Sequence, residues 1–145
     1  MTEEIGTAET TEITETNQTA QTEEPEAPFL IEAAVILHLS TQMNTTEVYA
    51  ERPKNPPAKY WIIEKTAADE ENHILKATIA VQSISSGSLL EAARMSQDAE
   101  NAMRSLIEVE NVGKSKLNSA YNFTDPETKE YRYQAVFDIY SMEGA

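Results

Sequence analysis

Residues 73–109 read HILKATIAVQSISSGSLLEAARMSQDAENAMRSLIEV, and this stretch decides the fold. Residues 73–85 alternate between two sets of side chains with a period of two, which is the pattern of a β-strand. Gly87 and Ser88 break the alternation. Ser88 followed by Glu91 forms the capping-box pattern that opens a helix, and apolar residues then recur every three or four positions. The stretch therefore predicts a strand that leads directly into an amphipathic helix.

The predicted helix extends to about Val109 and carries one apolar stripe. The stripe consists of Leu89, Ala92, Ala93, Ala99, Met103, Leu106 and Ile107. We expect its larger members to pack on the sheet face that carries Ile79, Val81, Tyr133 and Phe137.

The strand at residues 73–85 has a predicted partner on its N-terminal side. Residues 60–65, Tyr-Trp-Ile-Ile-Glu-Lys, are aromatic and β-branched, which favours a strand. Residues 67–72 are small or acidic, and we expect a turn there. On the C-terminal side, residues 114–123 alternate, residues 124–128 have turn chemistry, and residues 131–139 alternate again. The sequence therefore predicts two hairpins, one on each side of the helix.

The remaining elements precede the first hairpin. Residues 28–43 have helical periodicity with Pro28 at the first helical position, and residues 46–51 suit a short strand. Residues 52–57 hold three prolines and must be a loop. The order α-β-β-β-α-β-β predicts an α+β domain over residues 28–142. Its sheet should be antiparallel or mixed, with about four to five strands and both helices on one face.

Residues 1–27 differ in composition from the rest of the chain. They contain eight Glu, eight Thr and no basic residue. Their few apolar side chains cannot offset an ordering cost of about 1–2 kcal/mol per residue. We expect a disordered acidic tail, which either aids solubility or binds a basic neighbour in an assembly.

Composition argues against several classes of function. The 145-residue chain has 25 acidic and 11 basic side chains, for a net charge of −14, which disfavours specific nucleic-acid binding. It has no cysteine, and its four glycines do not form a phosphate-binding loop. His38 and His73 lack partners at metal-binding spacing, so we expect structural roles for both. No apolar run is long enough to cross a membrane, so no membrane partner is expected. We predict no enzymatic activity, no cofactor and no metal.

Three segments carry a resemblance to a known family. Residues 118–139 (NSAYNFTDPETKEYRYQAVFDI) are similar to the C-terminal part of tail-terminator, or tail-completion, proteins of long-tailed bacteriophages that infect Gram-positive hosts. Residues 48–53 with 59–66, and residues 71–74 with 77–83, resemble the same family in the same order. The resemblance spans about residues 30–140, and the acidic tail departs from the family pattern.

The resemblance implies a structural virion protein made in the bacterial host cytoplasm. Such a protein forms a ring, usually a hexamer, that caps the head-proximal end of the tail tube and stops its growth. Its partners would be further copies of itself, the major tail tube protein and the head-closure or connector protein. DNA would pass through the lumen without specific binding, which agrees with an acidic wall. Two alternatives stay open: another neck component, such as a head-closure or connector subunit, and an unrelated binding module or small enzyme.

A tube terminator must present two different axial faces, so loops at opposite ends of the sheet are candidate assembly interfaces. We select a Pro-rich loop, an acidic hairpin turn and the turn before the last strand. Their residues are Arg52, Pro53, Lys54, Pro56 and Pro57; Asp69, Glu70 and Glu71; and Phe123, Asp125, Lys129 and Tyr131.

Overall fold

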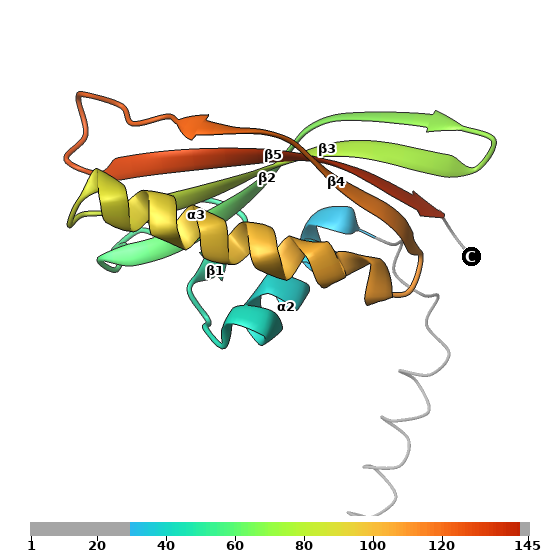
Figure 1. The fold of residues 1–145 in the computed structure, drawn as a ribbon, viewed down its shortest axis with the longest axis horizontal. Coiled ribbons are helices and arrows are strands. Elements are labelled where there is room, and N and C mark those ends of the chain that lie inside the picture. Colours follow the sequence, from blue (N-terminus) through green and yellow to red (C-terminus); the bar gives the residue numbers. More distant parts are fainter. Residues whose placement is uncertain (1–29, 143–145) are drawn as a thin grey trace, which may run out of the picture.

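The computed structural model describes residues 30–142, which form one five-stranded sheet with both helices on one of its faces (Figure 1). The elements in chain order are α2 (Ile31–Met43), β1 (Val48–Tyr49), β2 (Lys59–Glu71), β3 (Ile74–Ser85), α3 (Leu89–Arg104), the short 3₁₀ helix η1 (Ser105–Glu108), β4 (Val112–Asn122) and β5 (Tyr131–Met142). The predicted α+β class and the order α-β-β-β-α-β-β are confirmed. The acidic tail of residues 1–27 lies outside the described residues.

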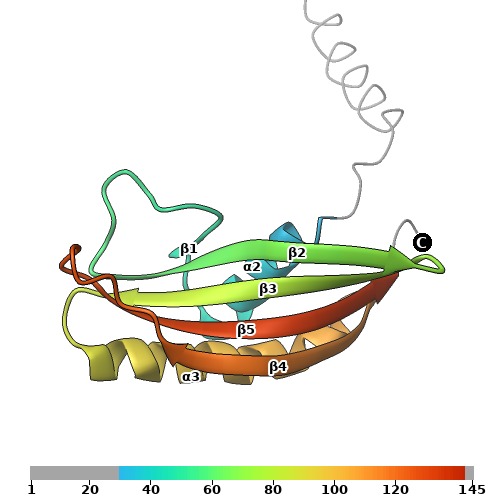
Figure 2. The same cartoon turned by 90° about the horizontal axis from the view of Figure 1, so that it is seen from above.

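The sheet is mixed, and its strand order is β1-β2-β3-β5-β4 (Figure 2). β1 pairs in parallel with β2 at only two positions, Val48 with Trp61 and Tyr49 with Ile62. The other three pairings are antiparallel and long. β1 is shorter than the strand predicted over residues 46–51, because the chain leaves the sheet at Ala50 toward the prolines.

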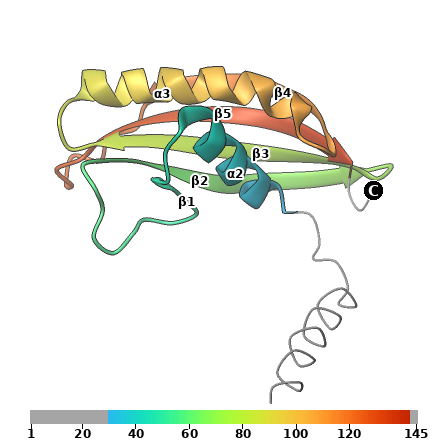
Figure 3. The same ribbon diagram turned by 90° about the horizontal axis from the view of Figure 1, so that it is seen from below.

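The core lies between the sheet and the helices, as Figure 3 shows from the helix side. Met103 and Leu106 belong to the same buried cluster as Ile79, Val81 and Phe137, as predicted. Tyr133, the fourth residue predicted for that sheet face, is only half-buried and is not part of the cluster. Each large side chain buried there contributes about 1.5–3 kcal/mol.

Two large residues of the predicted helical stripe are exposed, and Ala93 is only half-buried. Leu89 is 36% exposed because it starts the first turn of α3. Ile107 is 53% exposed because the α-helix ends at Arg104, and the tighter 3₁₀ turn changes the phase of the stripe. The predicted helix end near Val109 is therefore wrong for the α-helix. Met95, which the predicted stripe omits, is buried.

The predicted N-cap of α3 is confirmed, but only half of the capping box forms. The Ser88 hydroxyl accepts a hydrogen bond from the Glu91 backbone N–H at 3.0 Å. The Glu91 carboxylate instead accepts from the Ser85 hydroxyl at 2.6 Å and lies 3.6 Å from Lys59 Nζ. Glu91 therefore ties the start of α3 to β2 and β3.

α2 begins later than predicted. Leu30 has extended backbone (φ −112°, ψ 115°) and is the N-cap, so the helix starts at Ile31, and Pro28 is not its first residue. Asn44, with a φ of 55°, ends the helix in the left-handed conformation. His38 joins the two helices, because its Nε2 lies 3.0 Å from the Ala102 carbonyl oxygen and 2.9 Å from the Ser105 hydroxyl.

The hairpin of β2 and β3 corrects the predicted acidic turn. Residues 67–71 are part of β2, and Asp69 pairs with Lys76 across the ladder. The turn is only Asn72 and His73, with φ values of 56° and 67°. Two consecutive positive φ values are those of a type I′ turn, whose twist matches that of the strands and lets the ladder continue to its last pair. His73, predicted as the first strand residue, lies in this turn.

Candidate functional site

The Pro-rich loop and the turn before β5 meet at one end of the sheet, which we call the loop end. Arg52 Nη2 lies 3.3 Å from Glu130 Oε2, and the Tyr60 hydroxyl donates a hydrogen bond of 2.9 Å to the same oxygen. Tyr60 is fully buried, and the ring of Tyr49 packs against it edge-on with centroids 6.3 Å apart. Glu130 therefore links two loops that are far apart in the sequence.

The electrostatics at the loop end follow from this contact. Burial, together with the hydrogen bond to the Glu130 carboxylate, raises the pKa of Tyr60 above its ordinary value of 10.0. The same carboxylate raises the pKa of Arg52, so this guanidinium stays charged. The Tyr49 hydroxyl donates to Glu47, and that hydrogen bond raises the pKa of Tyr49. Tyr49 and Tyr60 are therefore neutral and Arg52 is charged near neutral pH.

The turn before β5 has a defined local structure. The Asp125 carboxylate accepts from the Glu127 N–H at 3.0 Å, and the Asp125 carbonyl accepts from the Thr128 N–H at 3.2 Å. The Thr124 hydroxyl accepts from the Arg132 N–H at 3.0 Å, which closes the base of the turn. This Asx-turn chemistry holds the loop without burying it.

Apolar and charged side chains at the loop end are exposed. Phe123 is 46% and Tyr131 39% exposed, and Lys129 is exposed beside them. In the Pro-rich loop, Lys54 is exposed, while Pro53, Pro56 and Pro57 are half-buried. The structure thus brings two of the three predicted loops together on one contiguous end.

The third candidate group lies at the opposite end of the sheet, the hairpin end. Asp69, Glu70 and Glu71 are the last residues of β2, and all three are exposed. Asp69 and Glu71 line a hollow of about 400 Å³ with four further residues, Asn72, Ile74, Lys76 and Tyr140. From Lys59 to Glu71, β2 has 13 residues, so the two ends are separated by about 40 Å.

The sheet face opposite the helices carries a polar network that sequence reasoning missed. Gln82 Nε2 donates to Gln134 Oε1 at 2.9 Å, and Gln134 Nε2 donates to the Tyr121 hydroxyl at 2.7 Å. Further along the same face, toward the turn of β2 and β3, Lys76 Nζ and Lys114 Nζ lie 5.9 and 5.3 Å from the centroid of the Tyr140 ring. The alternation of β3 and β5 indicated which residues share this face, but not that three strands are joined across it.

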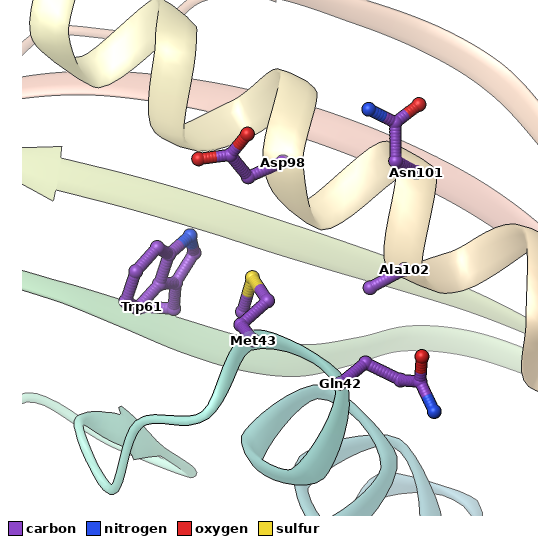
Figure 4. Close-up of a pocket in the computed structure, with 6 residues that line it drawn as sticks. All are labelled: Gln42, Met43, Trp61, Asp98, Asn101 and Ala102. Atoms are coloured by element: carbon purple, nitrogen blue, oxygen red, sulfur yellow. The ribbon is translucent and has the colours of Figure 1, made fainter.

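A separate hollow of about 430 Å³ lies between the end of α2, β2 and α3 (Figure 4). It is lined by Gln42, Met43, Trp61, Asp98, Asn101 and Ala102. The Trp61 indole N–H is directed to the Met95 carbonyl at 3.4 Å. The lining offers one carboxylate, Asp98, and two side-chain amides.

Residues 30–142, the described part of the chain, hold neither a metal-binding cluster nor a membrane-spanning helix. That part of the chain has no group of three or more His, Cys, Asp or Glu side chains placed to hold a metal ion. None of its helices is both long and apolar enough to cross a membrane.

Comparisons with known proteins identify no family. No protein-family model matches the chain, and no curated protein matches it. Among solved structures, one similar chain comes from the "Virion of native gene transfer agent (GTA) particle", with a TM-score of 0.44 and 16% identity. That match covers 78% of this chain and 94% of the other. At this identity and TM-score the likeness is too distant to assign a function.

Proposed function

We propose that this chain is a phage tail terminator, a structural virion protein that forms a ring on the head-proximal end of the tail tube. The proposal starts from the sequence resemblance, whose three segments fall on one structural unit. Residues 48–53 and 59–66 include β1 and half of β2, residues 71–74 and 77–83 include most of β3, and residues 118–139 connect β4 to β5. The resembling segments are therefore neighbours in the sheet, as expected if they preserve one surface.

The observation that carries the proposal is the arrangement of the candidate loops at two opposite ends of the sheet. The loop end has exposed aromatic side chains, prolines and exposed side chains of both charges, among them Lys54, Lys129 and Asp125. The hairpin end has Asp69, Glu70 and Glu71. A subunit with two chemically different ends suits a ring that binds the tube on one side and the connector on the other.

The remaining features agree with a non-catalytic role in the virion. The net charge of −14 disfavours adhesion to DNA that must slide through the lumen. We propose no enzymatic activity and no cofactor.

A head-closure or connector subunit would be favoured by a barrel-like fold without a long second helix, whereas α3 has 16 residues and covers the sheet. This feature supports the terminator over that alternative.

The proposal is tested by blocking one end at a time. Because the chain has no cysteine, Lys129→Cys and His73→Cys each create a single thiol, at the loop end and at the hairpin end respectively. Each is coupled to a bulky polyethylene-glycol maleimide, and Asp98→Cys, exposed on α3, serves as the control.

We expect the unlabelled protein to halt the growth of tail tube protein in vitro and to join capped tubes to heads, as seen by electron microscopy. The label at one end should abolish tube capping and the label at the other should abolish head joining. The Asp98 label should affect neither. An unlabelled protein that neither caps tubes nor joins heads would exclude the terminator function.

A further inference from the structure

The two edges of the sheet are unpaired along most of their length in the described residues. β4 has a neighbour, β5, on one side only. β2 has β1 beside it only at Trp61 and Ile62, and no other strand of the described residues lies along the outer side of residues 63–71 (Figure 2). Residues 64–71 are all exposed, and so are most residues of β4, including Leu117 at 44% and Tyr121 at 40%. Such edges are templates for pairing with another chain.

The two free edges carry opposite charges on the same face of the sheet. The ladder aligns Asp69, Lys76, Tyr140 and Lys114 in one row across four strands. The adjacent Ala77 and Ile139 belong to the core under the helices, so the alternation of side chains places this row on the helix-free face. The register puts Glu64 and Glu71 of β2 on that face too, and Lys116 of β4. The β2 edge is therefore acidic and the β4 edge basic.

Strand direction allows the two edges to join. β2 is antiparallel to β3, β3 to β5, and β5 to β4, so β2 and β4 run in opposite directions. A copy placed beside another would continue the sheet as an antiparallel ladder with the same face on the same side. Without a shift in register, Lys114 of one copy would lie opposite Asp69 of the next, with Glu71 on the diagonal.

We propose that the copies join head to tail, β4 of one against residues 63–71 of the next. This inference deepens the proposed ring and rests on it. The charges favour this contact over the two symmetric ones. β4 against β4 would place lysines opposite lysines, and β2 against β2 would place carboxylates opposite carboxylates. A heterologous contact of this kind closes into a ring when the rotation that relates neighbouring copies is a whole-number fraction of 360°.

The first test uses charge reversal in the full chain. Lys114→Glu with Lys116→Glu, and separately Asp69→Lys with Glu71→Lys, should each reduce assembly at least tenfold at low salt, measured as mass in solution. The chain with all four substitutions restores the opposite charges and should assemble again. Asp98→Lys, an exposed charge reversal on α3, should assemble like the wild type.

The second test uses cross-linking and does not depend on charge. Asp69→Cys with Lys114→Cys in one chain should give a ladder of disulfide-linked oligomers on oxidation, whereas either single variant should not. Within one chain the two positions are three strand spacings apart, about 14 Å, too far for a disulfide. Circular dichroism verifies folding of each variant.

The outcomes separate the two proposals. A wild-type ring with neither a charge effect nor a cross-linked ladder would overturn the edge pairing and leave the ring standing. Covalent dimers from the Lys114→Cys chain alone would show β4 against β4 and overturn it too. A wild-type chain that stays monomeric would overturn both proposals.

Discussion

Removing the Tyr60 hydroxyl tests how the loop end is held together. In Tyr60→Phe, the Glu130 carboxylate loses a donor at 2.9 Å and keeps only Arg52 at 3.3 Å. The phenol is fully buried, and the Glu130 side chain is 13% exposed, so water replaces the lost hydrogen bond poorly. A hydrogen bond to a charged group contributes about 1.5–3 kcal/mol, and we expect the free energy of unfolding to fall by that amount.

Urea denaturation monitored by circular dichroism measures this loss. Tyr49→Phe is the matched control. It also removes a hydroxyl that donates to a carboxylate, that of the nearby Glu47, but Tyr49 is only half-buried. We expect the control to lose less than about 0.5 kcal/mol. Equal losses for the two variants would refute a special role for the Tyr60 and Glu130 contact.

The pH dependence of stability gives a second readout of the same contact. The pKa of Tyr60 is raised in the folded state, so its contribution to stability is complete below the ordinary pKa of 10.0 and is lost as the pH rises through the folded value. The free energy of unfolding of the wild type should therefore decline above pH 10. The decline should be smaller in Tyr60→Phe, and an identical decline would contradict the assignment.

Three further predictions concern the fold. Leu106→Ala should cost about 3–5 kcal/mol, because Leu106 is fully buried, whereas Ile107→Ala, 53% exposed, should cost less than about 1 kcal/mol in the same urea titration. His73→Gly should raise the free energy of unfolding by a few tenths to about 1 kcal/mol, because glycine adopts the φ of 67° without strain; a loss would contradict the type I′ turn. The hydrogen bond from the Ser85 hydroxyl lowers the pKa of Glu91. The contribution of Glu91 to folding stability is therefore present above its ordinary pKa and is lost as the pH falls through the lowered value. Ser85→Ala should raise the pKa of Glu91 in an NMR titration.

The sequence predicted the order of the elements well because each has a strong local signal. Ser88 with Glu91 located the start of α3, and the alternation of β3 and β5 located their faces. The end of β2 was missed because Asp69 and its acidic neighbours are poor strand formers. Pairing with β3, fixed by the turn at Asn72, overrides that local preference.

The candidate site was only partly accessible to sequence reasoning. The alternation of strands indicated which loops lie at which end. The link between Arg52 and Glu130 joins residues 78 positions apart and leaves no local pattern. The opposite charges of the β2 and β4 edges depend on the strand order β1-β2-β3-β5-β4, which the sequence did not specify.

Native mass spectrometry of the full-length chain tests the central claim, the ring, most directly. We expect a closed assembly at six times the 16.2 kDa chain mass that persists on dilution to low micromolar concentration. Its negative-stain images should show a ring with an open centre. A single species at the mass of the monomer, or of a twofold dimer, would contradict the account.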